Sequence, residues 1–411
     1  MSQVAVIGAG IIGMAAARAL QQDGHAVTVF DPDEPGRGCS FGNAGHIAID
    51  HILPLARPAV LASLPRLLAD PLGPLRLRPA GLPRLLPWML RFAAACRPAQ
   101  VSAGTDALAA LLTLAGPAWS RAIDASGLAP LFRRHGSVNL YEGDPAAAAT
   151  EAAQLVAHGI RAEMWSAHEV ARRVPGLAVP VRAGRFLPDA CHSVDPHGVV
   201  LALARRFAAD GGRIERRAVD GFDLAEGRVR RIRAGGGHFV CDHVVLAAGS
   251  AAAPLARALG AAAPLTRERG YHVMLEPGAL DLDLPVTFAE RGFVVTPMQA
   301  GPRLAGTVEL GAFGAPDWRR ADILVTHARQ LFGRTTLAAA SRWSGDRPTL
   351  PDYLPMLGPA PRAGNAVLAL GHQHLGLTLA ATTGEIVAAL VAGRPAPVDL
   401  QAFRAERFGV I

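Results

Sequence analysis

The chain has 411 residues, half of them hydrophobic, which is enough for a large core divided between two domains. Its net charge of +7 comes from scattered arginines, without a basic run or interleaved aromatic residues, so a nucleic-acid-binding surface is excluded. The chain contains no lysine, which excludes a lysine Schiff base and a lysine general base. The four cysteines lie far apart and form no CxxC pair, so we expect neither a metal site nor a disulfide framework.

The N-terminal segment predicts a βαβ unit. Residues 4–7 and 27–30 are short apolar runs typical of buried parallel strands, and residues 14–22 between them have helical composition. Gly24 suits the end of that helix. The first strand begins at Val4 with no charged segment before it and no cleavage site after it, so we expect no signal peptide and a cytoplasmic protein.

Three glycines connect the first strand to the helix. Gly8 permits a tight turn, Gly10 lets backbone amides approach a pyrophosphate, and Gly13 permits close packing of the helix on the strand. Asp31 follows the second strand, where a carboxylate accepts a hydrogen bond from a ribose hydroxyl and repels a 2′-phosphate. The motif predicts a bound dinucleotide other than NADP, and it does not choose between FAD and NAD. A tight turn in an unrelated α/β protein is the alternative.

Two unusual segments follow. Residues 39–46 are polar and glycine-spaced, which is typical either of backbone that closely approaches a ligand or of an irregular connection. Residues 51–98 are rich in Leu, Pro and Arg, and Asp70 is their only acid. We expect short helices broken by proline, with arginines pointing outward and residues 88–90 and Phe92 pointing inward or toward a partner. This segment either packs over the site or rests on an anionic membrane.

The middle of the chain mixes helices with short strands. We expect helices at 106–125, 145–158, 196–210 and 322–332, strands at 136–141, 160–165, 185–188, 192–194, 270–276, 293–298 and 304–310, and hairpin strands at 213–219, 221–224, 228–233 and 238–241. Short strands of this kind suit a second domain built on an antiparallel sheet.

Two later segments return to the nucleotide. Residues 242–249 form an apolar strand ending in Ala-Ala-Gly, which lets a nucleotide cross the carboxyl edge of a sheet; a plain core strand is the alternative. Residues 367–370 predict a final strand, followed by a glycine-rich turn at 371–376 and a helix at 377–391. The N-terminus of this helix would favour negative charge at the ligand edge.

These motifs together resemble the FAD-dependent D-amino acid oxidase superfamily, and most closely its bacterial D-amino acid dehydrogenase branch. The resemblance rests on the N-terminal glycine motif with Asp31, on Ser40 to Gly45, Leu246 to Gly249 and Arg269 to His272, on Arg347-Pro348 followed by Pro351-Asp352 and Leu357-Gly358, and on Gly371-His372 with Leu375-Gly376. It implies an α/β and α+β protein in which a Rossmann-like FAD-binding domain (1–50, 195–264 and 344–411) is interleaved with a substrate domain on an antiparallel sheet (51–194 and 265–343).

The resemblance also implies a set of FAD-binding residues. They are Gly8, Gly10, Ile11, Ile12, Gly13, Asp31, Pro32, Ser40, Asn43, Ala44, Gly45, His46, Val219, Ala248, Gly249, Gly371, His372, Leu375, Gly376, Leu377 and Thr378. The FAD is expected to be noncovalent, because Gly42 stands where covalent relatives have a histidine and no cysteine follows Cys241.

Arg347 matches the family arginine that binds the substrate carboxylate through a bidentate fork. A structural ion pair with Asp346 or Asp352 is the alternative. We also expect Tyr271 and His374 in the catalytic site, and Tyr271, His374 and His46 against the substrate. Tyr271 either adds a hydroxyl to the carboxylate or packs in the core, and lone histidines are more often packed residues than ligands.

The implied reaction is transfer of the Cα hydrogen of a D-amino acid as hydride to flavin N5, after which water hydrolyses the imino acid. The turn at 371–376 resembles relatives that act on cyclic imino acids such as D-proline or hydroxy-D-proline. Oxidase relatives use a lysine to activate oxygen, and this chain has none, which favours another electron acceptor such as a membrane quinone. In that case the protein would be peripheral on the inner face of the membrane, touching it through 51–98. A glycine- or sarcosine-type oxidase, and an FAD-binding subunit of a hetero-oligomeric dehydrogenase, are the alternatives.

Overall fold

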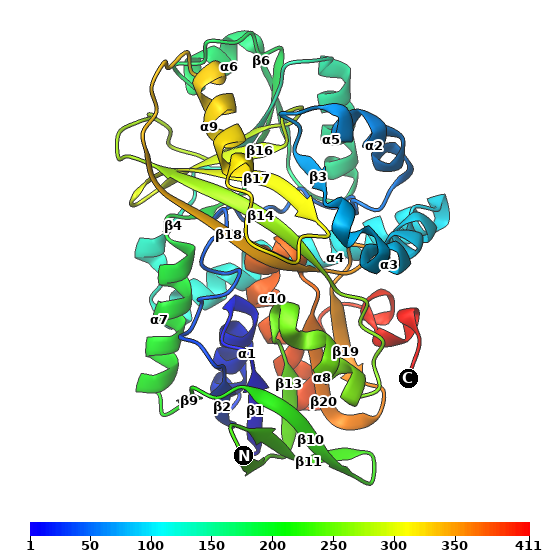
Figure 1. Cartoon of the computed structure of the whole chain (residues 1–411). Coiled ribbons are helices and arrows are strands. Elements are labelled where there is room, and N and C mark those ends of the chain that lie inside the picture. Colours follow the sequence, from blue (N-terminus) through cyan, green and yellow to red (C-terminus); the bar gives the residue numbers. More distant parts are fainter.

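A computed structural model describes residues 1–411, and two sheets organise it (Figure 1). The first sheet has six strands in the order β19-β20-β13-β1-β2-β9, parallel except for the edge strand β19. The strands are β1 (Gln3–Ile7), β2 (Ala26–Phe30), β9 (Arg213–Glu215), β13 (His243–Leu246), β19 (Met356–Ala360) and β20 (Ala363–Leu370). This sheet therefore collects segments from both ends and the middle of the chain.

Both faces of the first sheet are covered, as a parallel sheet requires. Along β1, Val4 and Val6 face one core and Ala5 and Ile7 face the other. The first core is closed by helices α1 (Ile11–Gln22), α4 (Pro98–Ser126), α7 (Pro196–Ala209) and α10 (Gly376–Val391). The second core is closed by α8 (Ala252–Ala258) and by the small sheet of β10 (Val219–Ala225), β11 (Arg228–Ala234) and β12 (Gly237–Val240).

The second sheet has nine strands and lies above the carboxyl edge of the first (Figure 1). Its order is β18-β14-β17-β16-β15-β5-β7-β6, with β3 beside β17. The strands are β3 (Leu75–Leu77), β5 (Ser137–Tyr141), β6 (Glu163–Ser166), β7 (Ala183–Leu187), β14 (Thr266–Leu275), β15 (Val286–Phe288), β16 (Phe293–Met298), β17 (Gly301–Leu310) and β18 (Ala339–Thr349). All pairs are antiparallel except β15 with β5 and β17 with β3, which confirms the predicted fold class.

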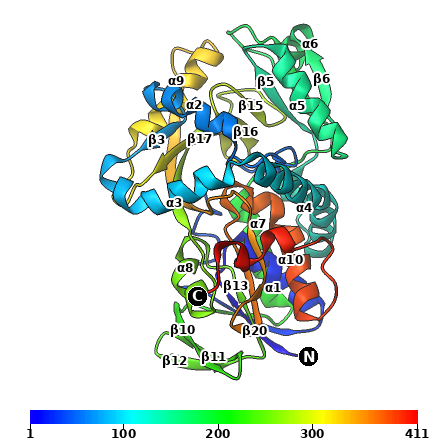
Figure 2. The same cartoon turned by 90° about the vertical axis from the view of Figure 1, so that its right-hand side faces the viewer.

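Shorter elements complete the chain. Helices α2 (Pro58–Ala69), α3 (Leu82–Ala95), α5 (Pro145–Ala157), α6 (Ala167–Arg173) and α9 (Arg319–Leu331) lie around the second sheet (Figure 2). A two-stranded sheet joins β4 (Phe132–Arg133) to β8 (His192–Ser193), and 3-10 turns lie at η1 (Pro79–Gly81), η2 (Ala129–Leu131), η3 (Gly249–Ala251), η4 (Gln373–Leu375), η5 (Gln401–Phe403) and η6 (Ala405–Phe408).

Two elements cross the domain boundaries expected from the sequence. Strand β18 pairs with β14 from Ala339 to Thr349, so it belongs to the second sheet on both sides of residue 344. Helix α4 packs on α10, with Trp119 donating to the carbonyl of Leu377, although its residues fall in the range 51–194. We therefore propose that the nucleotide-binding part includes α4 and resumes after Thr349.

Residues 51–98 form longer elements than predicted, because Pro65 and Pro87 are accommodated inside α2 and α3, and β3 was not predicted. Trp88 is buried as expected. Leu90 was expected to point inward or toward a partner, and of these two placements the inward one is wrong, because its exposed fraction is 65%. Leu82, Leu86 and Leu90 are spaced by four residues, so they form one exposed row, which we call the α3 stripe.

Two helices are long and apolar enough to cross a membrane, namely α4 and the segment Gln373–Val391 that contains α10. The second is a core helix, because most of it is buried between the first sheet and α4. For α4, one face packs against α10.

Candidate active site

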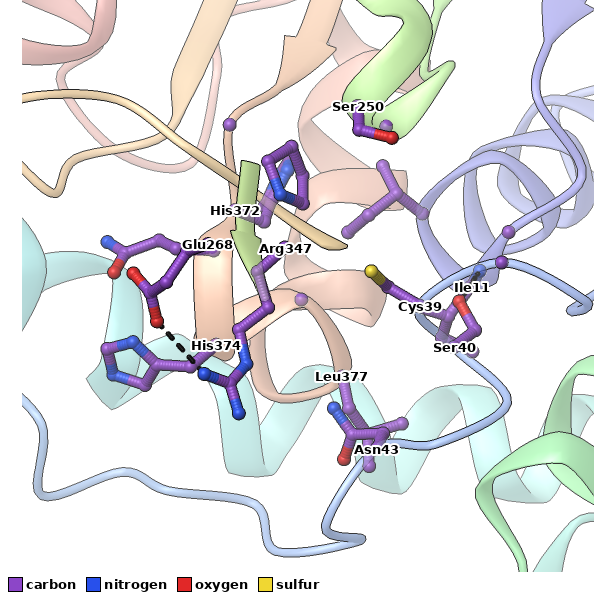
Figure 3. A pocket seen from close by; sticks show the side chains of 18 of the residues that line it. Ile11, Cys39, Ser40, Asn43, Ser250, Glu268, Arg347, His372, His374 and Leu377 are labelled. Carbon is purple, nitrogen blue, oxygen red and sulfur yellow. Dashed lines mark hydrogen bonds and ion pairs between the residues drawn. The ribbon is translucent and has the colours of Figure 1, made fainter. Parts of the chain in front are cut away.

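One cavity of about 1020 Å³ lies between the two sheets and extends from the N-terminal glycine motif to Arg347 (Figure 3). It begins at the carboxyl ends of β1, β2 and β13, passes the residue 39–46 loop, and ends below β14, β17 and β18. The carboxyl edge of a parallel sheet is where ligands bind in open α/β folds. The N-terminal glycine motif, the 39–46 loop and the later segments at 242–249 and 371–376 were predicted to surround a ligand, and they lie around one cavity.

At the nucleotide end, the backbone itself shapes the cavity. Gly8 has a φ of +110°, and a Cβ atom there would lie 2.4 Å from the carbonyl oxygen of Ala247. A Cβ atom on Gly13 would lie 1.8 Å from the carbonyl oxygen of Gly8. Only glycine fits at either position, which explains this part of the motif physically.

The acid and the hydroxyl near these glycines organise the turn. The Asp31 carboxylate accepts from the Ala9 amide at 2.7 Å, and the Ser40 hydroxyl accepts from the Ile11 amide at 2.9 Å. Both side chains also line the cavity. Asp31 thus fixes the turn while lying where a ribose hydroxyl is expected.

Two helix N-termini face the same cavity. Helix α1 starts after Gly10 and α10 starts after Leu375, and neither N-cap residue supplies a side-chain cap; in α1 the Ile11 amide bonds to the Ser40 hydroxyl. Uncapped amides and the helix dipole favour negative charge. The first terminus suits a pyrophosphate, and the second suits the negative charge that a reduced flavin carries.

The predicted cofactor residues divide into those that line the cavity and those that pack behind it. Lining residues are Gly8, Gly10, Ile11, Ile12, Asp31, Pro32, Ser40, Asn43, Ala44, His46, Val219, Ala248, Gly249, Gly371, His372, Gly376 and Leu377. Gly13, Gly45, Leu375 and Thr378 lie behind the wall. Thr378 accepts from the Ala48 amide at 3.0 Å, and a Cβ atom on Gly45 would lie 2.5 Å from the Ser193 carbonyl oxygen. These two residues therefore position the loop.

Arg347 marks the other end of the cavity. Its Nη1 donates to Glu268 at 2.9 Å, and its remaining nitrogens point away from Glu268 (Figure 3). A Cβ atom on Gly270 would lie 2.4 Å from Nη2, so the guanidinium lies directly over a glycine of β14. The guanidinium is thus held from two sides and retains donors for a ligand.

The expected alternative partners of Arg347 are occupied elsewhere. Asp346 accepts from Arg269 at 3.0 Å, and Asp352 pairs with Arg407. Arg347 instead uses Glu268, which is only 2% exposed. Sequence reasoning missed Glu268, whose single signal is its place beside the matched motif that begins at Arg269.

Glu268 is fixed by two further hydrogen bonds. The Thr349 hydroxyl donates to it at 3.1 Å and the Tyr353 hydroxyl at 3.0 Å. Burial and the neighbouring carboxylate of Glu268 raise the pKa of Tyr353 well above its usual range, so this hydroxyl stays a donor. A buried carboxylate with several donors is a rigid support for Arg347.

The structure does not bring the Tyr271 hydroxyl to Arg347. It donates to Glu309 at 2.8 Å and accepts from the Asp317 amide at 2.9 Å, and the ring packs in the core of the second sheet. Burial and the bond to Glu309 raise the pKa of Tyr271 to about 12. Tyr271 also lines the cavity, so it lies both in the core of the second sheet and at the cavity wall, with its hydroxyl directed to Glu309.

The histidines near the motifs lie in different settings. His272 contacts the Gly42 carbonyl oxygen at 3.1 Å and stacks on Trp343, and His372 contacts the Thr383 hydroxyl at 3.0 Å. His374 lies beside Arg347, with its Nε2 3.0 Å from His51 Nδ1 (Figure 3). Burial lowers the pKa of His272 and His372 to about 3 and of His46 to about 4, and it holds the pKa of His374 well below its usual value. These side chains are neutral at pH 7.

A second charged group lies in the cavity wall and was not predicted. The Asp50 carboxylate accepts from Arg185 at 3.0 Å and from Asn139 at 3.1 Å, and all three side chains are buried. Burial alone would raise the pKa of Asp50, but His51 and Arg185 hold it at about 2. The three residues come from segments up to 135 positions apart, so no sequence spacing reveals them.

A parallel sheet with a glycine cradle, roofed by a second sheet that presents an arginine, defines a two-domain dinucleotide-dependent oxidoreductase. The comparisons identify its family. The family model described as FAD dependent oxidoreductase (DAO) matches residues 3–390, so the chain belongs to the DAO family. Its cofactor is FAD, and the residues present fit that group: the glycine turn that has no room for a Cβ atom, the N-termini of α1 and α10, and Asp31 all border one cavity.

Named relatives cover nearly the whole chain. A D-amino-acid oxidase of Bradyrhizobium diazoefficiens is 34% identical over 98% of each chain. A D-amino acid dehydrogenase 2 of Ralstonia nicotianae is 35% identical over 95% of this chain and 97% of the relative. Among solved structures, L-proline dehydrogenase from P. horikoshii has a TM-score of 0.77 at 18% identity, covering 99% of this chain and 97% of its own. Glycine oxidase from Geobacillus kaustophilus has a TM-score of 0.75 at 22% identity and covers 99% of both. These structures support the fold.

Proposed function

We propose that this protein oxidises a D-amino acid at the Cα–N bond with FAD as its cofactor. The observation that carries the proposal is Arg347, pinned on one edge by Glu268 and free on the other inside the FAD cavity. The preference for D-amino acids is supported by relatives named D-amino acid dehydrogenase or oxidase.

The contribution of Arg347 is orientation. A guanidinium offers parallel N–H donors that match both oxygens of a carboxylate, so it fixes the direction of the substrate as well as its charge. Glu268 already holds one edge of the guanidinium, so substrate binding does not have to restrict the motion of the Arg347 side chain. FAD, when bound, supplies the acceptor for the hydride that leaves Cα.

The substrate amine must be neutral when the hydride leaves, because its lone pair assists the departure. His374 is uncharged beside Arg347, so it is able to accept a hydrogen bond from the amine. We propose His374 as a substrate-contacting residue together with Arg347.

We propose a cyclic imino acid, such as D-proline or hydroxy-D-proline, as the finer identity of the substrate. The support is the Gly371–Gly376 turn, whose sequence resembles relatives of that specificity. Its His374 narrows the cavity next to Arg347.

We further propose that the electrons leave to an acceptor other than oxygen, at the inner face of a membrane. The support is the surface formed by α2 and α3. The α3 stripe exposes Leu82, Leu86 and Leu90, with exposed Arg84 and Arg91 on the same helix. An apolar row flanked by arginines suits an anionic bilayer surface. Binding to vesicles containing anionic lipid, lost in a Leu86→Glu/Leu90→Glu double variant that retains FAD, tests this contact.

An oxidase that uses oxygen is the second candidate, because the Bradyrhizobium relative is named an oxidase. The two candidates differ in the second half of the reaction. Flavin reduced anaerobically by substrate should be re-oxidised slowly by air and rapidly by a quinone or an artificial dye. Rapid re-oxidation by air would instead support the oxidase.

The experiment that tests the main proposal is anaerobic reduction of the purified yellow protein. We expect the flavin absorbance to be bleached by at least one D-amino or D-imino acid and not by its L-enantiomer. Absence of bleaching across a broad panel of D-substrates would reject the proposal.

A further inference from the structure

The roof of the cavity carries a row of residues paired in register across four strand pairs. Arg185 pairs with Asn139, Asn139 with Thr287, Thr287 with Val294, and Val294 with Ala305. Directly paired residues on neighbouring strands point to the same side of a sheet, and all five line the cavity. The row is apolar toward β17 and polar toward β7, so the cavity has a polar end below β5 and β7.

The polar end is completed by residues of the loop that precedes α2. Asp50 bonds to Asn139 and Arg185, and His51 Nε2 lies 4.0 Å from its second oxygen, Oδ1. We call Asp50, Asn139, Arg185, His46 and His51 the Asp50 cluster. His374 contacts His51 at 3.0 Å and also lies beside Arg347, so it connects the carboxylate end to this cluster.

Four polar atoms of the Asp50 cluster are buried without a hydrogen-bond partner. They are Asp50 Oδ1, Asn139 Oδ1, His46 Nε2 and Arg185 Nε. Asp50 and Asn139 are 6% and 7% exposed, and both line the cavity. A buried polar atom without a partner costs on the order of 1–3 kcal/mol, so such atoms grouped at a cavity wall point to a ligand that satisfies them.

The chemistry of these atoms restricts the ligand. The oxygens of Asp50 and Asn139 accept hydrogen bonds, since Asp50 is ionised and the Asn139 amide nitrogen already donates to it. A group that reaches them must therefore be a donor. Purely aliphatic or carboxylate side chains leave the two acceptors unsatisfied or repel them.

We propose that the Asp50 cluster is the subsite for the substrate side chain, and that this side chain ends in a hydrogen-bond donor, a hydroxyl or a protonated amine. The inference rests on the proposed oxidation of a D-amino acid at Arg347. With the carboxylate on Arg347, a side chain directed past His374 meets Asp50 and Asn139. The cluster selects among D-amino acids and takes no part in the hydride transfer.

The test compares matched substrates in the anaerobic reductive half-reaction of the holoenzyme, which separates the dissociation constant from the rate of flavin reduction. One pair is 4-hydroxy-D-proline against D-proline, and the other is D-lysine against D-norleucine. In at least one pair we expect the donor-bearing member to have a dissociation constant at least about tenfold lower, as expected for a hydrogen bond to a charged group. The pair that responds identifies the donor as a hydroxyl or an amine.

Variants assign the effect to the Asp50 cluster. Asn139→Leu and, separately, Asp50→Asn should reduce the ratio to within about threefold while the substrate without the donor keeps its dissociation constant. Ser137→Ala is the matched control: it removes another buried polar atom without a partner from the same strand, β5, and Ser137 does not line the cavity. This control should keep the wild-type ratio.

Each outcome is decisive. Equal dissociation constants within both pairs would overturn the subsite while leaving D-amino acid oxidation in place. A ratio that survives in both Asn139→Leu and Asp50→Asn, or that is lost equally in Ser137→Ala, would also overturn it. If no D-amino acid reduces the flavin, the proposed function fails, and the subsite fails with it.

Discussion

The two ends of the cavity are built in different ways. The nucleotide end is made of backbone: Gly8 and Gly13 fit only as glycine, and the amides of one turn face the ligand. The Arg347 end is made of side chains from three segments, with Arg347 on β18, Glu268 on β14 and His374 on η4. Backbone geometry tolerates no substitution, whereas a side-chain constellation is altered residue by residue. We therefore expect the first end to set the cofactor and the second to set the substrate.

Breaking the backbone end should have the largest effect. A Gly13→Val substitution places side-chain atoms into the carbonyl of Gly8, so we expect loss of FAD and of nearly all soluble yellow protein. Gly116→Ala is the matched control, because a Cβ atom there meets nothing within 4 Å. The flavin-to-protein absorbance ratio measures the outcome, and a wild-type ratio in Gly13→Val would contradict this account of the turn.

Removing the arginine should abolish turnover and leave the cofactor in place. Arg347→Leu removes the paired hydrogen bonds from the guanidinium to the substrate carboxylate. We therefore expect kcat/KM to fall by about 10²–10⁴ while FAD is retained. Arg267→Leu is the control on the neighbouring strand, since Arg267 is exposed and lies 3.8 Å from Asp346. Steady-state kinetics with a dye acceptor measure both. Activity of Arg347→Leu within threefold of wild type would remove Arg347 from the site.

Acid should destabilise the folded protein through its buried histidines. His46, His272 and His372 have folded pKa values of about 3 to 4, below the ordinary value of 6.5. Below pH 6.5 the unfolded chain takes up these protons and the folded protein does not, so stability is complete above pH 6.5 and falls as the pH decreases toward 4. Each such histidine contributes about 1.4 kcal/mol per pH unit.

Urea unfolding of the holoenzyme at saturating FAD between pH 7.5 and 5 measures this slope. A His372→Gln variant should reduce the slope by about one proton. The exposed His168→Gln variant is the control and should keep it. A slope unchanged by His372→Gln would show that this histidine is not held neutral.

Loosening the support of Arg347 should have a smaller effect than removing it. Glu268→Gln keeps the shape and removes the charge that pins Nη1, so we expect KM to rise roughly tenfold with kcat changed less. The control is Glu276→Gln, which changes an exposed glutamate directly after the end of β14. An unchanged KM would mean that Arg347 is positioned by Gly270 and the strand alone.

The smallest effect is expected at Tyr271. Its hydroxyl serves Glu309 and Asp317, so Tyr271→Phe should lower the free energy of unfolding by about 1 kcal/mol and leave KM within twofold. Thermal unfolding and steady-state kinetics measure the two quantities. A large rise in KM with unchanged stability would return Tyr271 to the substrate site.

The same contrast explains what the sequence could predict. The βαβ unit and its glycines are contained in 31 residues, and local patterns report local geometry. Arg347 was found through a motif of adjacent residues. Glu268, Asp50, Asn139 and Arg185 were not found, because each is ordinary in its own segment and becomes informative only when strands from distant segments pair.

Errors in the predicted elements have similar causes. Residues 213–219 were expected as one strand, but the chain leaves the first sheet after β9 and enters the small sheet at β10. Leu90 was expected to point inward or toward a partner, and the helix turns it outward, away from the buried Trp88. Both outcomes depend on how distant segments pack together, and the propensities of neighbouring residues do not contain that information.

The central claim is that Arg347 presents the carboxylate of a D-amino acid to the FAD cavity. The most direct measurement is anaerobic stopped-flow reduction of wild-type and Arg347→Leu holoenzyme with one D-amino acid and its L-enantiomer. We expect rapid bleaching of the wild type by the D-enantiomer alone, and at least a hundredfold loss in the variant at equal flavin content. Bleaching of the variant at the wild-type rate, or of the wild type by neither enantiomer of any substrate tested, would contradict the account.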